Sequence, residues 1–153
     1  MGNKGKPKPA TKPTTKFSIL YFNSLSIVNK RQSLDDILKS NLFNMVLITE
    51  TWLESFHRDS LVIDTSNYYI IRCDRKQGKH GGVAAICPIA DAPYISNIDL
   101  DSSQCEGFEI LAIDMYRTKF ISTRIIVVYL PPISSKNLII VKNLIHVLHL
   151  LYT

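Results

Sequence analysis

The stretch that decides the fold runs Met45-Val-Leu-Ile48 and leads directly into Thr49-Glu50-Thr51. An unbroken run of four apolar residues between polar neighbours is typical of a strand buried inside a sheet. The polar residues that follow such a strand lie at the edge of the sheet. We therefore expect a layered fold built around residues 45–48, with Glu50 at its rim.

Further strands and a helix are predicted on either side of this segment. A buried strand over residues 17–22 precedes it, and the spacing of Leu34, Ile37 and Leu38 predicts a helix between the two strands, with Ser33 as N-cap and Asp35 and Asp36 in the first turn. Four more strands are expected after it, over residues 68–72, 83–87, 107–114 and 120–130. The last two form a hairpin around residues 117–119, and Pro131-Pro132 ends the second. This mixture predicts an α/β fold, with sheets covered by helices.

A second helix is expected over residues 137–152. One face is predicted to carry its apolar side chains, namely Leu138, Val141, Leu144, Ile145, Leu148 and Leu151. Lys142, His146 and His149 fall on the other face, so the i, i+3 histidine pair is interpreted as a polar face and not as a metal site. A helix with no strand after it indicates an incomplete domain.

The charge of the chain is concentrated at its beginning. The 153 residues have a formal charge of +5 and a pI near 9.1, and five lysines fall within the first sixteen residues. Residues 1–16 hold almost nothing apolar and are expected to be a disordered basic leader, either a nucleic-acid-binding arm or simply solvated. Residues 17–153 are then expected to form one domain.

Composition makes several classes of protein unlikely. With 46% apolar and 20% charged residues, the chain has the balance of a globular protein. Cys73, Cys87 and Cys105 are widely spaced, which argues against a zinc site or a disulfide framework. No secretory signal and no apolar run of roughly 18 residues is visible. We expect an intracellular protein, cytoplasmic or nuclear, with no membrane partner.

Three polar residues fall at the ends of predicted strands. Asn23 follows the first strand, Glu50 follows the second, and Tyr129 ends the strand before Pro131-Pro132. Side chains in such positions can converge in a cleft at one edge of a sheet. Glu50 could offer Mg²⁺ a hard oxygen ligand, and the amide and phenol could orient a phosphate. The plainer alternative for a glutamate in this position is a solvated strand end.

The motifs of this chain resemble those of the endonuclease domains of non-LTR retrotransposons. The string Thr49-Glu50-Thr51-Trp52-Leu53 is the most specific of them. The segments that carry the resemblance are, in chain order, Ile19–Leu25, Val46–Leu53, Arg72–Arg75, Gly81–Ala84, Glu106–Ile110 and Val127–Pro132. Several motifs in the right order are harder to obtain by chance than one.

The resemblance implies an endonuclease/exonuclease/phosphatase fold, a two-sheet α/β sandwich that nicks DNA with the help of Mg²⁺. By this match Glu50 is the metal ligand, Asn23 the active-site amide and Tyr129 the phenol that contacts phosphate. Arg72 and Arg75 match a segment near the substrate, so they are candidate substrate-binding residues. The alternative for this segment is a surface cluster of salt bridges, and for Gly81-Gly82 a simple hairpin turn.

The chain also departs from the family pattern. Leu130 stands where the family has an arginine, and neither the Gly-Asp-Phe-Asn motif nor an Asp-His pair occurs in the 153 residues. These motifs supply the other half of the family's active site, so we expect the chain to be inactive by itself. Two alternatives remain open: a non-catalytic nucleic-acid-binding remnant that uses the lysine-rich leader, and a fragment of a phosphatase or lipid phosphodiesterase.

Overall fold

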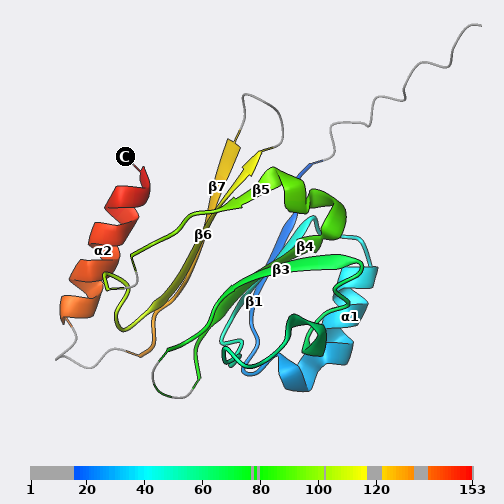
Figure 1. Cartoon of the computed structure of the whole chain (residues 1–153), viewed down its shortest axis with the longest axis horizontal. Coiled ribbons are helices and arrows are strands. Elements are labelled where there is room, and N and C mark those ends of the chain that lie inside the picture. Colours follow the sequence, from blue (N-terminus) through cyan, green and yellow to red (C-terminus); the bar gives the residue numbers. More distant parts are fainter. Residues whose placement is uncertain are drawn as a thin grey trace, which may run out of the picture.

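The computed structural model of the chain describes residues 16–76, 78, 80–101, 103–116, 122–132 and 138–152. Within these ranges the protein is a mixed α/β structure with two sheets, one of four strands and one of three (Figure 1). The expected α/β class with two sheets is therefore confirmed. The expected leader, apart from Lys16, and the hairpin turn at residues 117–119 lie outside the described residues.

The four-stranded sheet is built around the segment that was expected to be central. Its strands have the order β1 (Ile19–Asn23), β2 (Met45–Thr49), β4 (Val83–Pro88) and β3 (Tyr68–Cys73). β1 and β2 are parallel and are connected through helix α1 (Arg31–Lys39), whereas β4 is antiparallel to both of its neighbours. All five residues of β2 are buried, because both faces of this strand are covered.

The start of α1 differs from the expected one. A short 3-10 turn, Val28–Lys30, runs directly into the helix, and Lys30 occupies the N-cap position without a side-chain cap. Ser33 is therefore inside the helix, and no aspartate lies in its first turn. The apolar spacing correctly placed the helix, but the preceding turn extended it toward the N-terminus, so the predicted cap was wrong.

The second sheet contains β5 (Ile95–Asn97), β6 (Glu109–Tyr116) and β7 (Ser122–Tyr129), in that order and antiparallel. The pairing of β6 with β7 confirms the expected hairpin, and β7 ends immediately before Leu130 and the two prolines. β5 was not expected from the sequence. Neither were the short 3-10 helices Asp59–Leu61 and Ile89–Tyr94.

Three apolar clusters hold these layers together. The first lies between α1 and the four-stranded sheet and includes Leu34, Ile48 and Ile86. The second fills the space between the two sheets, where Leu47 and Val83 meet Ile113. The third lies between the outer face of the second sheet and helix α2 (Leu138–Tyr152). The order of layers is helix, sheet, sheet, helix, with α1 and α2 on opposite sides of the molecule (Figure 1).

Helix α2 packs with only part of the expected face, namely Leu144, Leu148 and Leu151. Val147 and Leu151 are buried, and Ile140, Leu144 and Leu148 pack beside them. Leu138 and Ile145 were assigned to the packed face, but they are about three-fifths exposed. Apolar residues surround most of this helix, so the periodicity alone could not identify the buried stripe. None of the described helices has the length and apolar character needed to cross a membrane.

Candidate active site at the strand ends

The three residues predicted at strand ends come together in space. The side-chain nitrogen of Asn23 donates a hydrogen bond to Glu50 Oε1 over 3.0 Å, and the same carboxylate lies close enough to the Tyr129 phenol to raise the pKa of that phenol. Asn23 and Glu50 meet because β1 and β2 are parallel and end at the same edge, where Asn23 lies opposite Thr49. Tyr129 comes from the other sheet and packs against the inter-sheet cluster. The cluster therefore spans both layers of the fold.

The pKa of Tyr129 reflects this position. Burial raises the pKa above its ordinary value of 10.0, and the hydrogen bond to Glu50 raises it further. Arg75 opposes this effect, because its positive charge lowers the pKa of the phenol. The phenol therefore stays protonated at neutral pH and remains a hydrogen-bond donor.

The backbone of Glu50 is held in a conformation that non-glycine residues seldom adopt. Its φ is +51°, and that of Trp52 is +55°. Such residues cost about 1–3 kcal/mol each and persist only where surrounding contacts enforce them. Here the amide of Ser26 donates to the Glu50 carbonyl over 3.0 Å, and Ser24 Oγ donates to it over 2.8 Å. Enforced strain of this kind is often found at functional sites, which makes Glu50 the leading candidate residue.

Asn23 is oriented by its own loop. Its side-chain oxygen accepts a hydrogen bond from the amide of Leu25 over 3.1 Å, which turns the nitrogen toward Glu50. The ammonium of Lys30 donates to the carbonyls of Ser24, Leu25 and Ser26. Lys30 thereby secures a loop in which Leu25 and Ser26 also have positive φ. The amide is preorganised to hold one oxygen of Glu50.

The Gly81-Gly82 segment supports the same loop from the other side. The amides of Thr51 and Trp52 donate to the carbonyls of Gly82 and Gly81 over 3.3 and 2.9 Å. Gly82 has a φ of +83°, and a Cβ at this position would collide with Thr51 Oγ1. Only glycine fits here, since the backbone conformation and the close approach both exclude a side chain. The two glycines therefore do more than turn a hairpin.

Glu109 is a site residue that the sequence did not reveal as one. It lies directly opposite Tyr129 in the β6–β7 register and is buried. Arg75 Nε donates to Glu109 Oε1 over 2.8 Å, and the amide of Gly82 donates to Oε2 over 3.4 Å. The Arg75 guanidinium lies 5.8 Å from the centre of the Tyr129 ring. Arg75 is thus part of the cluster, and Glu109 holds it there. The signals in the sequence were a carboxylate at the start of an apolar strand and its place in the segment Glu106–Ile110, to which no role was assigned.

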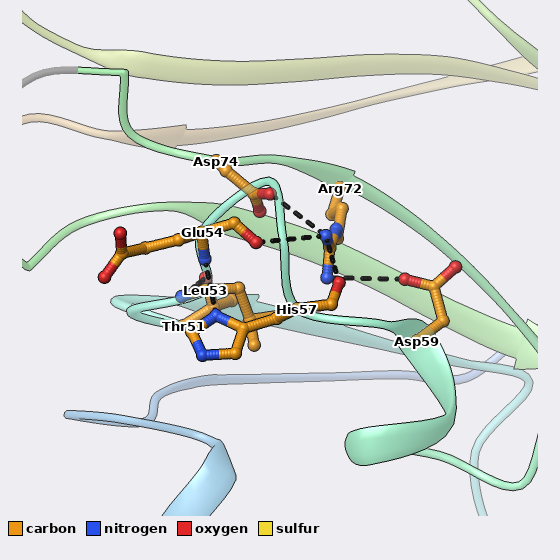
Figure 2. Close-up of polar contacts among 7 residues, drawn as sticks. All are labelled: Thr51, Leu53, Glu54, His57, Asp59, Arg72 and Asp74. Carbon is orange, nitrogen blue, oxygen red and sulfur yellow. Dashed lines mark hydrogen bonds and ion pairs between the residues drawn. The ribbon is translucent and has the colours of Figure 1, made fainter.

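Arg72 lies elsewhere, on the face of β3 opposite to Ile71 and Cys73, which pack between the sheets. It donates to the carbonyls of His57 and Glu54 over 2.7 and 3.3 Å, and it forms ion pairs with Asp74 and Asp59 at 3.3 and 3.4 Å (Figure 2). This geometry is that of the salt-bridge alternative. Burial raises the pKa of the Asp74 carboxyl, and the charge of Arg72 partly offsets that effect. The structure does not bring Arg72 to the other predicted site residues.

Leu130 also points away from the cluster. It packs against the outer apolar cluster with α2, whereas Tyr129, its neighbour in the chain, faces the space between the sheets. Alternation along the strand explains the difference. A side chain at position 130 therefore lies away from the inner face of β7, where Arg75 approaches Tyr129.

The chemistry of Glu50 fits a hard divalent ion. Among the described residues there is no group of three or more His, Cys, Asp or Glu side chains that could hold a metal ion. Mg²⁺, however, keeps several water molecules and commonly binds through one or two carboxylates together with substrate phosphates. Glu50 is half-buried and offers such a carboxylate, with one oxygen fixed by Asn23.

No protein-family model and no curated protein matches this sequence. An interpretation of the cluster therefore depends on its residues. It combines one carboxylate with an oriented amide, a protonated phenol and an anchored guanidinium. Together these groups could bind a phosphate diester and a divalent ion at one point on the molecule.

Proposed function

We propose that this chain carries part of a Mg²⁺-dependent phosphodiesterase site of the kind found in the endonuclease domains of non-LTR retrotransposons. The observation that supports the proposal is the convergence of Asn23 and Tyr129 on the carboxylate of Glu50. A mixed α/β structure with two packed sheets is consistent with the endonuclease/exonuclease/phosphatase fold that the motifs imply. The proposed reaction is hydrolysis of one strand of DNA.

The residues of the cluster have distinct roles in this proposal. Glu50 holds the metal ion, and Asn23 fixes the orientation of its carboxylate. The Tyr129 hydroxyl, kept protonated by its surroundings, donates a hydrogen bond to a phosphate oxygen. Arg75 places a positive charge beside the same phosphate, and Glu109 keeps that charge in position. Bound Mg²⁺ would supply positive charge to the phosphate and activate water for attack.

The proposed site is incomplete within these 153 residues. A preorganised group is worth about 10²–10³ in rate, and general acid–base catalysis about 10²–10⁴. The family's second set of motifs, which provides these contributions, does not occur in the sequence. We therefore expect weak ion binding and no measurable turnover by this chain alone.

Ion binding and turnover are tested separately. Mn²⁺ is a paramagnetic substitute for Mg²⁺, and it should broaden the side-chain amide signal of Asn23 in nuclear magnetic resonance spectra of the full chain. Glu50→Gln keeps the size of the side chain but removes the charge, so the broadening should disappear. Equal broadening in the variant, or none in either protein, would rule out an ion site at Glu50.

A nicking assay on supercoiled plasmid with Mg²⁺ tests turnover, with Glu50→Ala as the control. We expect both proteins to leave the plasmid intact. Nicking that occurs with the natural chain and disappears in the control would show that the chain is active by itself. It would support the phosphodiesterase assignment and contradict the expected inactivity.

The same cluster could serve a phosphatase or a lipid phosphodiesterase, since a fold does not fix a substrate. The string Thr49–Leu53 and the pair Pro131-Pro132 after Tyr129 favour the DNA-cleaving branch by resemblance. Competition for Mn²⁺-loaded protein between a DNA oligonucleotide and inositol phosphate would separate these substrate classes. Stronger competition by the inositol phosphate would contradict the DNA assignment.

A further inference from the structure

We propose that the hollow between the start of α1 and the loop 54–61 is a second contact surface for the nucleic-acid strand. This inference rests on the proposed function, because it assigns more of the path of the same substrate. The hollow has a volume of about 440 Å³ and is open to solvent. Its lining comes from six described residues, namely Arg31, Phe56, His57, Arg58, Ser60 and Leu61.

The hollow is connected to the active-site cluster by two segments that run side by side. The chain leaves Asn23 through residues 24–30 and reaches Arg31, and it leaves Glu50 through residues 51–57 and reaches Arg58. The two segments are linked by backbone hydrogen bonds: Ser26 donates to Glu50 over 3.0 Å, and Ile27 donates to Thr51 over 3.0 Å. The hollow and the cluster therefore belong to one hydrogen-bonded pair of loops, which fixes their positions relative to each other.

The loop that forms one wall is held rigidly. The amide of Glu54 donates to His57 Nδ1 over 2.9 Å, and the amide of His57 donates back to the Glu54 carbonyl over 2.9 Å. Arg72 donates to the carbonyls of both of these residues and so fastens the turn to β3 (Figure 2). The Arg72 side chain is largely buried and has two carboxylate partners. Removing these charges from water costs desolvation free energy, although the contact fixes only a surface loop. The side chains that this turn exposes to solvent are therefore held in position before any ligand binds.

Phe56 lies at the tip of this fixed turn. Its side chain is 71% exposed, although it is large and apolar, and its ring centre lies 4.3 Å from that of His57. Aromatic side chains presented in this way are the surfaces on which unpaired bases stack. Because Arg72 holds the turn, little further ordering is needed when a base binds.

The charge of the hollow matches a phosphate backbone. Two of its lining residues are arginines, and none of the six is a carboxylate. Two carboxylates close to it in the chain are engaged in ion pairs, since Asp59 pairs with Arg72 at 3.4 Å and Asp35 pairs with Lys39 at 3.4 Å, whereas Glu54 is exposed in the same turn as His57 and forms no ion pair with a described residue. Among the described residues, neither Arg31 nor Arg58 forms an ion pair. Cations beside an exposed aromatic ring fit a single nucleic-acid strand better than an apolar partner.

The test is the salt dependence of oligonucleotide binding by the full chain, followed by fluorescence anisotropy. Arg31→Gln and Arg58→Gln should each reduce the slope of log affinity against log salt by about 0.7, the value for one phosphate contact on a single strand. Lys142→Gln removes the same charge from α2, on the far side of the molecule, and should leave the slope unchanged (Figure 1). An equal effect of all three variants would overturn the proposal, because it would indicate a general effect of net charge.

Phe56→Ala tests for the stacked base. It should weaken binding of an ordinary oligonucleotide by about 5- to 100-fold. The same substitution should have little effect on a strand with abasic positions, which keeps the phosphates but lacks the bases. Loss of affinity that is equal for both strands, or absent for both, would overturn the strand assignment. Undetectable binding of any oligonucleotide by the natural chain would overturn it as well.

The inference and the proposed function can fail independently. Glu50→Gln should abolish the broadening of the Asn23 signal by Mn²⁺. It should not change the amount by which Arg31→Gln and Arg58→Gln reduce the slope of log affinity against log salt. If the ion effect is seen and these variants behave like the natural chain, the surface is wrong and the phosphodiesterase proposal survives. If Arg31→Gln and Arg58→Gln reduce the slope but Mn²⁺ does not broaden the Asn23 signal, the hollow is a nucleic-acid contact surface and the phosphodiesterase proposal is wrong.

Discussion

Gly82 shows at the level of a single residue how closely the loops of the candidate site are packed. Its amide donates to Glu109, its carbonyl accepts from Thr51, and a methyl group in place of its hydrogen would meet Thr51 Oγ1. Thr51 is completely buried and has no room to move aside. The position of the Glu50 loop therefore depends on the absence of one carbon atom.

Gly82→Ala should lower the free energy of unfolding through two effects. A positive φ costs alanine about 1–2 kcal/mol, and overpacking adds about 1–3 kcal/mol. Gly78→Ala is the matched control, because Gly78 has a φ of +85° but no atom within 4 Å of its hypothetical Cβ. Denaturant unfolding of both variants measures the difference. Equal losses would mean that Thr51 does not restrict position 82.

Tyr129 should make stability depend on pH at alkaline values. Its pKa is raised in the folded protein, first by burial and then by Glu50, whereas the unfolded chain has the ordinary value. The favourable contribution is therefore fully present below the unfolded pKa, and it is lost as the pH rises through the folded pKa. Unfolding free energies measured above and below pH 10 should fall less steeply in Tyr129→Phe than in the natural chain. Parallel pH profiles would contradict this prediction.

The residues that could be predicted for the site share one property. Asn23, Glu50 and Tyr129 interrupt or end apolar runs, so their positions at strand ends are visible in the sequence, and the structure brings them together. Glu109 could not be found in this way, because its partner Arg75 lies 34 residues earlier in the chain. The geometry of Arg72 depends on two backbone carbonyls, which no pattern of side chains reveals.

At the scale of elements, the sequence identified those with a long apolar pattern. β2 was predicted almost to the residue, since burial on both faces requires an unbroken apolar run. β5 has only three residues, so it could not be distinguished from a loop. The start of α1 was set by the preceding 3-10 turn. The buried stripe of α2 was set by the second sheet, where Ile110 of β6 and the preceding Phe108 pack beside it.

Two leucines of α2 test which stripe of this helix is packed. Leu151 is 4% exposed and Leu138 is 63% exposed, although the sequence placed both on one face. Leu151→Ala should reduce the free energy of unfolding by about 2–5 kcal/mol, because it leaves a cavity against the second sheet. Leu138→Ala makes the same chemical change in solvent and should cost less than about 0.5 kcal/mol. Similar losses in thermal or denaturant unfolding would show that the helix packs through another face.

For the whole molecule, the notable feature is apolar surface that no described residue covers. The outward side of α2 exposes Leu138, Ile139, Ile145, Leu150 and Tyr152. In the described structure, β1 and β7 are edge strands of the two sheets. Exposed edges and apolar helical faces favour association between molecules.

Sedimentation velocity should therefore show association that increases with protein concentration. Ile139→Lys and Ile145→Lys should each shift the distribution toward the monomer, because both side chains are more than half exposed on α2. Leu42→Lys provides the control, since Leu42 is 70% exposed but lies beyond the end of α1 on the other side of the fold. Monomeric behaviour at all concentrations, or an equal shift with Leu42→Lys, would contradict the role given to α2.

The origin of Tyr129 in the second sheet has a consequence for how the candidate site is lost. Asn23 and Glu50 lie at the ends of neighbouring parallel strands, so they stay near each other as long as the first sheet remains folded. Tyr129 lies beside them only while the two sheets remain packed against each other. A partly unfolded state could keep its strands but lose the packing between the two sheets. Such a state would retain its far-ultraviolet circular dichroism, although Tyr129 would already be separated from Asn23 and Glu50. The ionisation of one phenol would thus report the docking of two layers before any strand has melted.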